Sequence, residues 1–310
     1  FRKKYLYEGR YRIVPLNFGQ YNNERIFDFE EVGISTKDMS FQDYLFLRAL
    51  ALLVESLHNG RPFYEYFKYA RTFGIQPATL LKTMYDNIAQ SSKKIQTIMS
   101  EFIEETQGEL WNSEEELVSF YKKDENYKKL KEGKVGGNLI YKYKSKNLVE
   151  AGKDWIDFFE GQVFQIVKKM NFDQVSLNEI KNELFEISKF CKFKLNGLLN
   201  IKSNTDSISE EFNYNLMEWI DNEESELKLD KFKFKNGNKK FYFEFTSDQL
   251  SVRKDIFKRY GTDINALSKI VTRISNLEGQ FRKIRYDEDR YLRDIYKQVG
   301  ENFIKYALSN

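Results

Sequence analysis

The sequence predicts a mainly α-helical protein, a multi-helix bundle around a buried central helix. Three observations favour this fold class. Apolar residues recur at intervals of three and four through most of the chain after residue 40. Only three prolines interrupt 310 residues, so long helices are permitted. The segment 40–60 is apolar on nearly all sides, as is typical of a helix that other helices surround.

The central helix is predicted between Ser40 and Gly60. The Ser40 side chain can accept a hydrogen bond from the backbone three residues later, and Asp43 stands near the positive end of the helix. Gly60 is a suitable residue to end it. Arg48 is the only charged residue in the stretch 44–54. Both helix ends are therefore specified by the sequence, and the chain that follows is expected to form a helical shell.

The N-terminal segment is expected to be extended. Apolar and aromatic residues alternate loosely in 1–14 and again in 26–35, which predicts short strands or extended arms. The chain also begins without methionine, so we expect a piece of a longer protein. Residues 1–39 are accordingly assigned to an extended segment that continues from a missing upstream core.

Residues 40–226 are predicted to form a helical domain, because one amphipathic stretch follows another. Two Ser-x-x-Glu capping boxes, at Ser113 and Ser176, mark helix starts. The glycine-rich stretch 133–137 lacks the Walker pattern and is interpreted as a turn. The predicted helices cover 62–73, 77–88, 91–106, 113–121, 138–143, 154–170 and 176–192.

Residues 227–310 are predicted to form a β-hairpin and basic C-terminal helices. Phenylalanine alternates with lysine in 231–235, before Asn236-Gly237, and with Tyr242 and Glu244 in 241–245 after it, which predicts one hairpin over 231–245. Helices are expected over 247–260 and 262–274. From residue 250 to the end there are thirteen Lys or Arg and eight Asp or Glu.

The overall charge favours no strongly charged partner. The formal net charge is +3, so there is no strong attraction to nucleic acid or to anionic lipid. Clusters of lysine with Tyr or Phe at 141–146 and 190–194 are expected by chance in this composition, and do not favour nucleic-acid binding. Eight carboxylates in 206–226 and six lysines in 228–240 are interpreted as solvated faces of opposite sign.

Cysteine content and hydropathy restrict the location. One cysteine, Cys191, allows no internal disulfide and no multi-cysteine metal site, and we interpret it as a small buried apolar residue. No apolar run approaches the roughly 20 residues that span a bilayer. The sequence therefore predicts a cytoplasmic protein that is not inserted in a membrane.

Candidate functional residues lie on the central helix. Tyr44, Arg48 and Glu55 are spaced by four and seven residues, so they follow one line of that helix. This stripe either faces solvent or a neighbouring helix as an ordinary polar face, or lines a wet cavity. His58, the lone histidine, either complements the negative end of the helix or acts as a base or ligand. Only one Glu-x-x-His pair exists, so half of a carboxylate-bridged metal site is missing, and no catalytic, cofactor or metal ligand is assigned.

Two runs of sequence carry a resemblance to a known family. The first is residues 29–44, FEEVGISTKDMSFQDY, together with the Leu-His-Asn-Gly end of the central helix at 57–60. The second is residues 109–117, ELWNSEEEL, with GKVGGNLI at 133–140. These runs resemble the region that follows the catalytic core in cobalamin-binding radical SAM proteins.

The resemblance implies that this chain is a C-terminal accessory region of such an enzyme, a lid or a substrate-positioning region. The parent enzyme would use SAM, a four-iron four-sulfur cluster and cobalamin, and the partner of this chain would be its own upstream catalytic domain. The family's CxxxCxxC and DxHxxG motifs are not in this sequence, so no family catalytic residue is carried over. We expect this chain alone to bind no cofactor, and we expect Tyr44, Arg48, Glu55 and His58 to lie nearest the unknown substrate.

The alternative is a free-standing helical protein-interaction module. Its acidic segment 206–226 and its basic C-terminal part would then contact protein partners. Charge separation without a catalytic group of residues is the observation that favours this second class.

Overall fold

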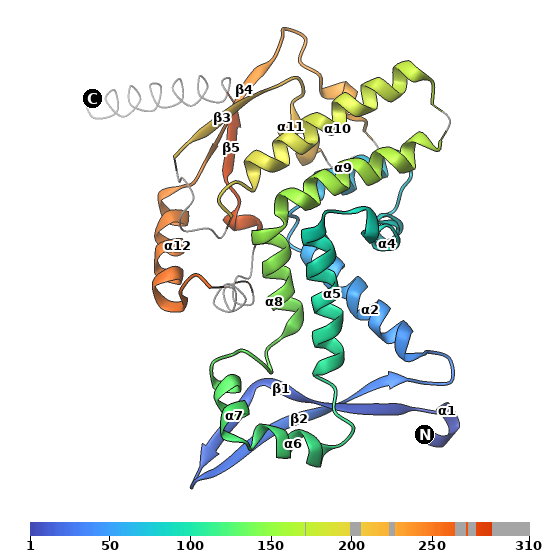
Figure 1. The fold of residues 1–310 in the computed structure, drawn as a ribbon. Coiled ribbons are helices and arrows are strands. Elements are labelled where there is room, and N and C mark those ends of the chain that lie inside the picture. The colour runs from blue at the N-terminus through green and yellow to red at the C-terminus, as the bar shows by residue number, and fades with distance from the viewer. Residues whose placement is uncertain (171, 199–205, 223–226, 264–270, 272–276, 287–310) are drawn as a thin grey trace, which may run out of the picture. The chain divides into compact units, whose positions relative to one another are not determined.

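The computed structural model describes residues 1–310 except 171, 199–205, 223–226, 264–270, 272–276 and 287–310. The described part is mainly helical, with a two-stranded and a three-stranded antiparallel sheet (Figure 1). It divides into two compact units whose segments interleave along the chain. Unit 1 holds Phe1–Pro62, Leu81–Trp155 and Ile256–Leu277, and unit 2 holds Phe63–Leu80, Ile156–Asp255 and Glu278–Asn310.

A long β-hairpin begins unit 1. After the short helix α1 (Arg2–Tyr5), β1 (Glu8–Tyr21) pairs antiparallel with β2 (Glu24–Ser35). The connecting Asn22 and Asn23 have φ of 48° and 63°, the left-handed conformation that a tight hairpin turn requires. Asparagine tolerates this conformation better than most residues. The expected extended segment is therefore a paired ribbon, whose Asn-Asn turn was not recognised in the sequence.

Helix α2 (Phe41–Leu53) begins where the sequence predicts. The Ser40 side chain accepts a hydrogen bond from the Asp43 N–H, and the Asp43 side chain accepts one from the Ser40 N–H. Val54–His58 then continues as the π-helical segment η1. The helix is buried along one side, but Leu47 on the other side is 50% exposed. Although α2 is apolar on nearly all sides, only one of its sides is buried.

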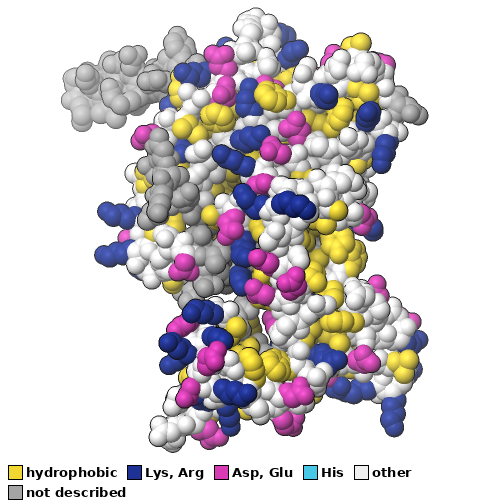
Figure 2. All heavy atoms as spheres, viewed as in Figure 1, with side chains coloured by type: hydrophobic (Ala, Val, Ile, Leu, Met, Phe, Trp, Pro, Cys, Tyr) yellow, Lys and Arg dark blue, Asp and Glu magenta, His cyan; other side chains and the backbone are white. Residues whose placement is uncertain are grey.

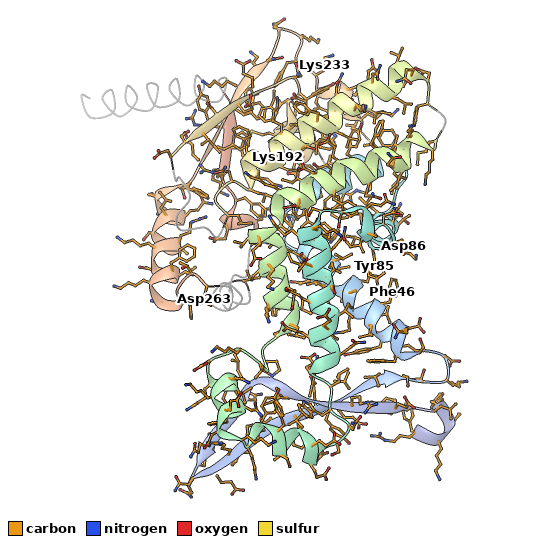
Figure 3. The ribbon with its side chains drawn as sticks, in the orientation of Figure 1. Phe46, Tyr85, Asp86, Lys192, Lys233 and Asp263 are labelled. Atoms are coloured by element: carbon orange, nitrogen blue, oxygen red, sulfur yellow. The ribbon has the colours of Figure 1, made fainter. Side chains whose placement is uncertain are left out.

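More helices of unit 1 follow, and of these the sequence did not predict α7. They are the 3-10 turn η2 (Ile88–Gln90), α5 (Lys93–Gly108), α6 (Glu114–Tyr121), α7 (Asp124–Lys131), α8 (Leu139–Ser145) and the π-helical η3 (Lys146–Glu150). The preceding helix α4 (Pro77–Asp86) passes from unit 2 into unit 1 at Leu81. Phe46 of α2 meets Tyr85 of α4 edge to face, with ring centroids 5.0 Å apart (Figure 3). This contact joins two helices within unit 1.

Helices α6 and α7 cover one face of the β1–β2 hairpin. Their Leu117 and Tyr127 pack with Ile13 of β1 and Phe27 of β2 in one buried cluster. Burial of side chains of this size stabilises the fold by about 1.5–3 kcal/mol each. On the face shown in Figure 2, acidic and basic side chains are interspersed over this part, at the bottom of the view.

The helix that is buried on all sides is α3 (Tyr64–Arg71), in unit 2. Every residue from Glu65 to Ala70 is buried. α9 (Gly152–Lys168) and α10 (Gln174–Lys194) pack against it, and Phe159 of α9 stacks on Tyr66 with ring centroids 5.0 Å apart. Within unit 2, α3 is therefore surrounded on all sides, as the sequence had predicted for the helix at 40–60.

A three-stranded antiparallel sheet completes the described core of unit 2. Its strands, in spatial order, are β3 (Ile208–Phe212), β4 (Lys239–Glu244) and β5 (Lys283–Tyr286). The hairpin predicted over 231–245 needs correction, because only its second arm is a strand. The first arm begins in the 3-10 turn η4 (Leu229–Phe232), and β4 instead pairs with β3 and β5. The helix α11 (Leu216–Asp221) lies between β3 and η4 along the chain, and the 3-10 turn η5 (Glu278–Gln280) precedes β5.

Burial of aromatic side chains explains this pairing. Phe241 and Phe243 of β4 and Phe212 of β3 are fully buried, and all three rings pack around Phe190 of α10. The lysines of 231–235 are exposed. Pairing β4 with β3 therefore buries more apolar surface than a hairpin with that lysine-rich arm would bury.

Polar side chains of α3 are satisfied by α10. The Tyr69 hydroxyl donates to Glu183 at 2.6 Å, and the Lys194 ammonium contacts both carboxylate oxygens of Glu65 at 2.6 and 2.7 Å. The buried Cys191 thiol lies 3.4 Å from Glu65, and burial raises the pKa of this thiol well above its ordinary value. Cys191 is thus buried, as predicted, and its thiol is held in the protonated, unreactive form.

We expect Glu183→Gln to become more stable relative to the parent as the pH rises from about 4 to about 7. Burial raises the pKa of the Glu183 carboxyl above its ordinary value and outweighs the hydrogen bond from Tyr69, which lowers it. A raised carboxyl pKa contributes stability below the unfolded-state pKa, and this contribution is lost as the pH rises through the folded-state pKa. The amide variant has no such loss.

Urea unfolding at both pH values measures this change. Glu104→Gln, on an exposed residue of α5, controls for removal of one charge. A difference between the Glu183→Gln variant and the parent that stays constant with pH would contradict the prediction.

Two further predictions concern the C-terminal helices and insertion in a membrane. The helix predicted over 262–274 and the basic segment beyond residue 286 lie mostly or wholly outside the described residues, while α12 (Ser247–Tyr260) is present as expected. Among the helices that the structure describes, none is long and apolar enough to cross a membrane.

Candidate functional site

The four residues predicted from the central helix separate into two groups. Tyr44 and Arg48 lie on α2 beside Glu109, the residue that follows α5. Glu55 and His58 lie in η1 and have other neighbours. The candidate site is therefore built around Glu109, and only half of the predicted residues contribute to it.

We call Arg12, Glu30, Tyr44, Arg48 and Glu109 the Glu109 cluster. Arg12 Nη1 donates to Glu109 Oε1 at 3.0 Å, and Arg48 Nη2 lies 3.9 Å from the same oxygen. On its other side, Arg12 Nε donates to Glu30 at 2.7 Å. Two guanidinium groups and two carboxylates thus alternate within contact distance.

Four structural elements hold this cluster: β1, β2, α5, and α2, which carries Tyr44 and Arg48. Arg12 comes from β1, Glu30 from β2, and Glu109 stands at the C-cap of α5. The backbone of Trp111 forms two hydrogen bonds with Tyr11, of 2.9 and 2.8 Å, which attach this end of α5 to the edge of the hairpin. Glu109 is therefore positioned by backbone pairing two residues away.

Burial dominates the electrostatics of the site. The side chain of Glu109 is only 17% exposed. Its burial raises the pKa of the carboxyl, against the opposing attraction of Arg12 and Arg48. Burial also raises the pKa of the Tyr44 phenol, although both arginines act to lower it, and raises that of Tyr121 to about 12. Both phenols are protonated donors near neutral pH.

Several buried polar atoms near Glu109 have no hydrogen-bond partner in the described part of the structure. They are Tyr44 Oη, Arg48 Nε and Thr106 Oγ1. A buried donor left unpaired costs about 1–3 kcal/mol, so such atoms mark strain or a place where a further polar group binds. Tyr44, with only 8% of its surface exposed, is the most informative of them.

Glu55 belongs to a second group of contacts, which the π-helical segment η1 makes with α8 and with the π-helical segment η3. Lys144 Nζ donates to Glu55 at 2.6 Å, and Asn147 of η3 donates to Ser56 of η1 at 3.1 Å. The Trp155 indole donates to the same Asn147 side chain at 3.1 Å. Segments of this kind are rare and occur frequently at functional sites.

His58 lies at the end of η1. Its side chain is exposed, and its Nδ1 lies 3.4 Å from the Asn59 side chain, which itself donates to Glu55 at 2.7 Å. This position at the end of η1 agrees with the structural alternative, in which the ring complements a helix end.

Sequence reasoning missed Arg12 and Glu109. The usable signal was the spacing of Glu101, Glu105 and Glu109, which recur every fourth residue along α5. Each of these carboxylates meets a cation: Glu101 contacts Lys146, Glu105 contacts Lys142, and Glu109 contacts the arginines. Such periodic carboxylates indicate a helix face that pairs with basic residues from elsewhere.

The cluster can bind and orient a polar group, and the buried carboxyl can hold a proton. Arginine forks suit planar carboxylates or phosphates, and the phenol can donate to an oxygen. Within the described residues, no three His, Cys, Asp or Glu side chains are placed so that they could hold a metal ion.

Fold and site together define a mainly helical protein with a partly buried arginine–carboxylate cluster. No protein-family model matches the chain, and no curated protein matches it significantly.

Proposed function

We propose that this chain is the C-terminal accessory region of a cobalamin-dependent radical SAM enzyme, where it acts as a lid or positions the substrate. The SAM, the four-iron four-sulfur cluster and the cobalamin would be held by an upstream catalytic domain. The proposed location is the cytoplasm, which agrees with a sequence that has a single cysteine.

The observation that carries the proposal is that the separate runs with the family resemblance pack together in unit 1. Ile34 and Tyr44, from the first run, share a cluster with Leu110 from the second. Trp111 and Leu117, from the 109–117 part of the second run, share another cluster with Val135 from its 133–140 part. Runs that resemble one family and also form one packed structure support a common origin better than scattered matches would.

The Glu109 cluster is the part of this unit with the chemistry to contact a substrate. Tyr44 and Arg48 come from the first run or directly after it, and Glu109 begins the second. In the proposed role, Arg48 and Tyr44 bind a polar group of the substrate, while the reactive centre is supplied by the upstream domain.

The test begins with the coding sequence upstream of Phe1. We expect a CxxxCxxC motif there, within the same reading frame. An upstream frame without that motif would overturn the proposal.

A complementation experiment then measures the function itself. The upstream domain, produced alone and reconstituted with its cofactors, is expected to cleave SAM but to modify its substrate efficiently only when this chain is added. If the upstream domain is equally active without the chain, the chain has no accessory role. Capture of an unrelated protein in place of the upstream domain would favour the free-standing interaction module.

A further inference from the structure

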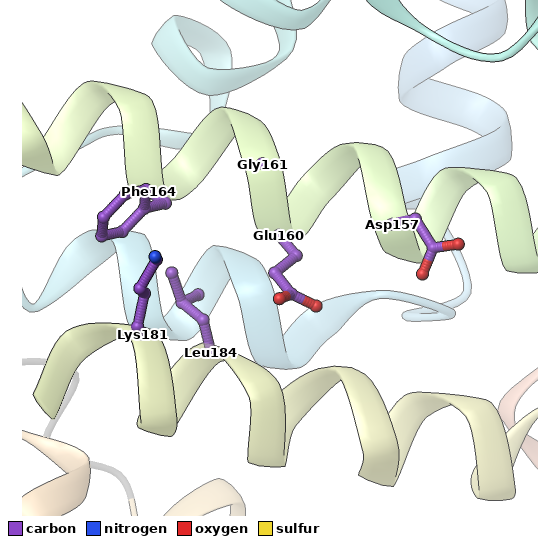
Figure 4. Close-up of a pocket in the computed structure, with 6 residues that line it drawn as sticks. All are labelled: Asp157, Glu160, Gly161, Phe164, Lys181 and Leu184. Carbon is purple, nitrogen blue, oxygen red and sulfur yellow. The ribbon is translucent and has the colours of Figure 1, made fainter. Parts of the chain in front are cut away.

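Unit 2 contains a hollow between α9 and α10 that the proposed function does not use. Its volume is about 330 Å³, which is near the lower end of the range for small-molecule sites. Figure 4 shows residues of α9 on one side and Lys181 and Leu184 of α10 on the other. The lining residues are Asp157, Glu160, Gly161, Phe164, Lys181 and Leu184.

Opposite charges line this hollow without neutralising each other. Lys181 Nζ lies 5.4 Å from the centre of the Phe164 ring, and no ion pair joins Lys181 to a carboxylate among the described residues. Asp157 pairs with Lys192 at 2.8 Å, and both side chains remain well exposed. Glu160 forms no ion pair in the described part of the chain. An ammonium and a carboxylate therefore face one space and remain available.

The Glu160 carboxylate is held in place by buried hydroxyls. The Ser188 hydroxyl donates to Glu160 Oε2, and the Tyr66 hydroxyl lies 2.7 Å from Ser188 Oγ and 3.2 Å from the Ile156 carbonyl. Tyr66 and Ser188 are both buried. This network fixes one carboxylate oxygen and leaves Oε1 without a hydrogen-bond partner in the described structure.

Gly161 keeps the middle of the hollow open. A Cβ atom at Gly161 would meet no atom within 4 Å, so close packing does not require glycine there. Glycine inside a helix costs about 1 kcal/mol relative to alanine. Gly161 is one of the residues that line the hollow, so a larger side chain at this position would reduce the open space.

We propose that this hollow binds a small zwitterion, a free α-amino acid with an apolar side chain. Its carboxylate pairs with Lys181, its ammonium group pairs with Glu160, and its side chain packs against Phe164 and Leu184. A simple cation would leave Lys181 repelled, and a simple anion would face Asp157 and Glu160. A ligand that carries both charges matches the whole lining.

Three probes separate the two charges of the ligand: L-leucine, L-leucinamide, which has no carboxylate, and N-acetyl-L-leucine, which has no ammonium. Isothermal titration calorimetry on the full chain is expected to give L-leucine a dissociation constant of about 0.1–1 mM. Each of the other two probes is expected to bind at least about tenfold more weakly, because each loses one charge-assisted contact. Equal affinity for the three probes, or no binding of any up to about 10 mM, would overturn the proposal.

Variants then locate the binding site. Lys181→Met is expected to weaken L-leucine about tenfold and to leave L-leucinamide unchanged. Lys153→Met, at an exposed lysine in the first turn of the same helix that carries Glu160, controls for loss of a positive charge. A variant at Lys181 that binds L-leucine as the parent does would also overturn the proposal.

Gly161→Leu provides a test that does not remove a charge. Filling the hollow is expected to abolish L-leucine binding while the melting temperature is kept or raised, since leucine favours the helix more than glycine does. Gly152→Leu, at the first residue of α9 and also without atoms within 4 Å of an added Cβ, is the matched control and is expected to bind normally. Unchanged binding in the Gly161→Leu variant would place the ligand elsewhere.

Discussion

Replacing Lys194 with methionine is expected to lower the free energy of unfolding by about 3–5 kcal/mol. The side chains of Lys194 and Glu65 are only 8% and 3% exposed, and the ammonium contacts both carboxylate oxygens. Removing the lysine charge leaves the carboxylate buried without its partner, and such a charge is costly in a medium of low dielectric constant. Chemical denaturation followed by circular dichroism measures the loss.

A double variant separates the charge effect from a packing effect. Glu65→Leu combined with Lys194→Met is expected to recover most of the lost stability, because removing both charges also removes the desolvation cost of both. Lys82→Met is the control: Lys82 and Asp86 form an exposed ion pair, with side chains 60% and 51% exposed, and its loss is expected to cost at most about 0.5 kcal/mol. A double variant as unstable as Lys194→Met alone would contradict this account.

Glu109→Gln is expected to lower the free energy of unfolding by at most about 1 kcal/mol at neutral pH. Arg48 loses its ion pair, but burial already disfavours the charged form of the Glu109 carboxyl and raises its pKa, and the neutral amide removes that cost. Within the described residues, Glu109 forms the only ion pair of Arg48, whose guanidinium otherwise lies 5.7 Å from the centre of the Phe102 ring. Arg12 still forms its ion pair with Glu30 in this variant, so Arg48 is the residue left without an ion pair. Urea unfolding at neutral pH gives the magnitude.

The comparison with a neighbouring carboxylate makes this result specific. Glu104→Gln, at an exposed position on α5, removes the same charge from the same helix and is expected to change stability little. Arg48→Met combined with Glu109→Gln is expected to cost less than the sum of the single changes, since the two residues share one interaction. Additive losses would show that Arg48 and Glu109 do not stabilise each other.

Local features of the fold were predictable because they depend on neighbouring residues. The hydrogen bonds that begin α2 involve only Ser40 and Asp43, and Ser113 caps α6 in the same way. Most helices appear where apolar residues recur every three or four positions. Such patterns predict an element and its start, but they carry no information about which distant element covers it.

Long-range pairing explains the features that were not predicted. Strand β4 pairs with residues about thirty positions before it and about forty after it, while the Asn-Gly turn beside it suggested a local partner. The burial of Phe190 against that sheet decided the pairing, and this contact is invisible in a local pattern. Similarly, Leu47 is exposed because no described element covers that side of α2.

The candidate site was predictable to the same limited extent. The helical spacing correctly placed Tyr44 and Arg48 together on α2, but their partners Arg12 and Glu109 are 97 residues apart in the sequence. The predicted line through Tyr44, Arg48 and Glu55 assumed a regular α-helix, whereas the chain from Val54 to His58 is π-helical. Helical spacing therefore holds only as far as the helix stays regular.

The two π-helical segments have a consequence for how relatives of this chain would align. A π turn accommodates one residue more than an α turn, so a relative without the extra residue could keep both flanking helices in place. Because Ser56 and Asn147 join η1 to η3, a shift in one segment would break a contact with the other. We therefore expect a relative that lacks the extra residue in η1 to lack it in η3 as well. Single-residue gaps should then appear in both segments of the same aligned sequence.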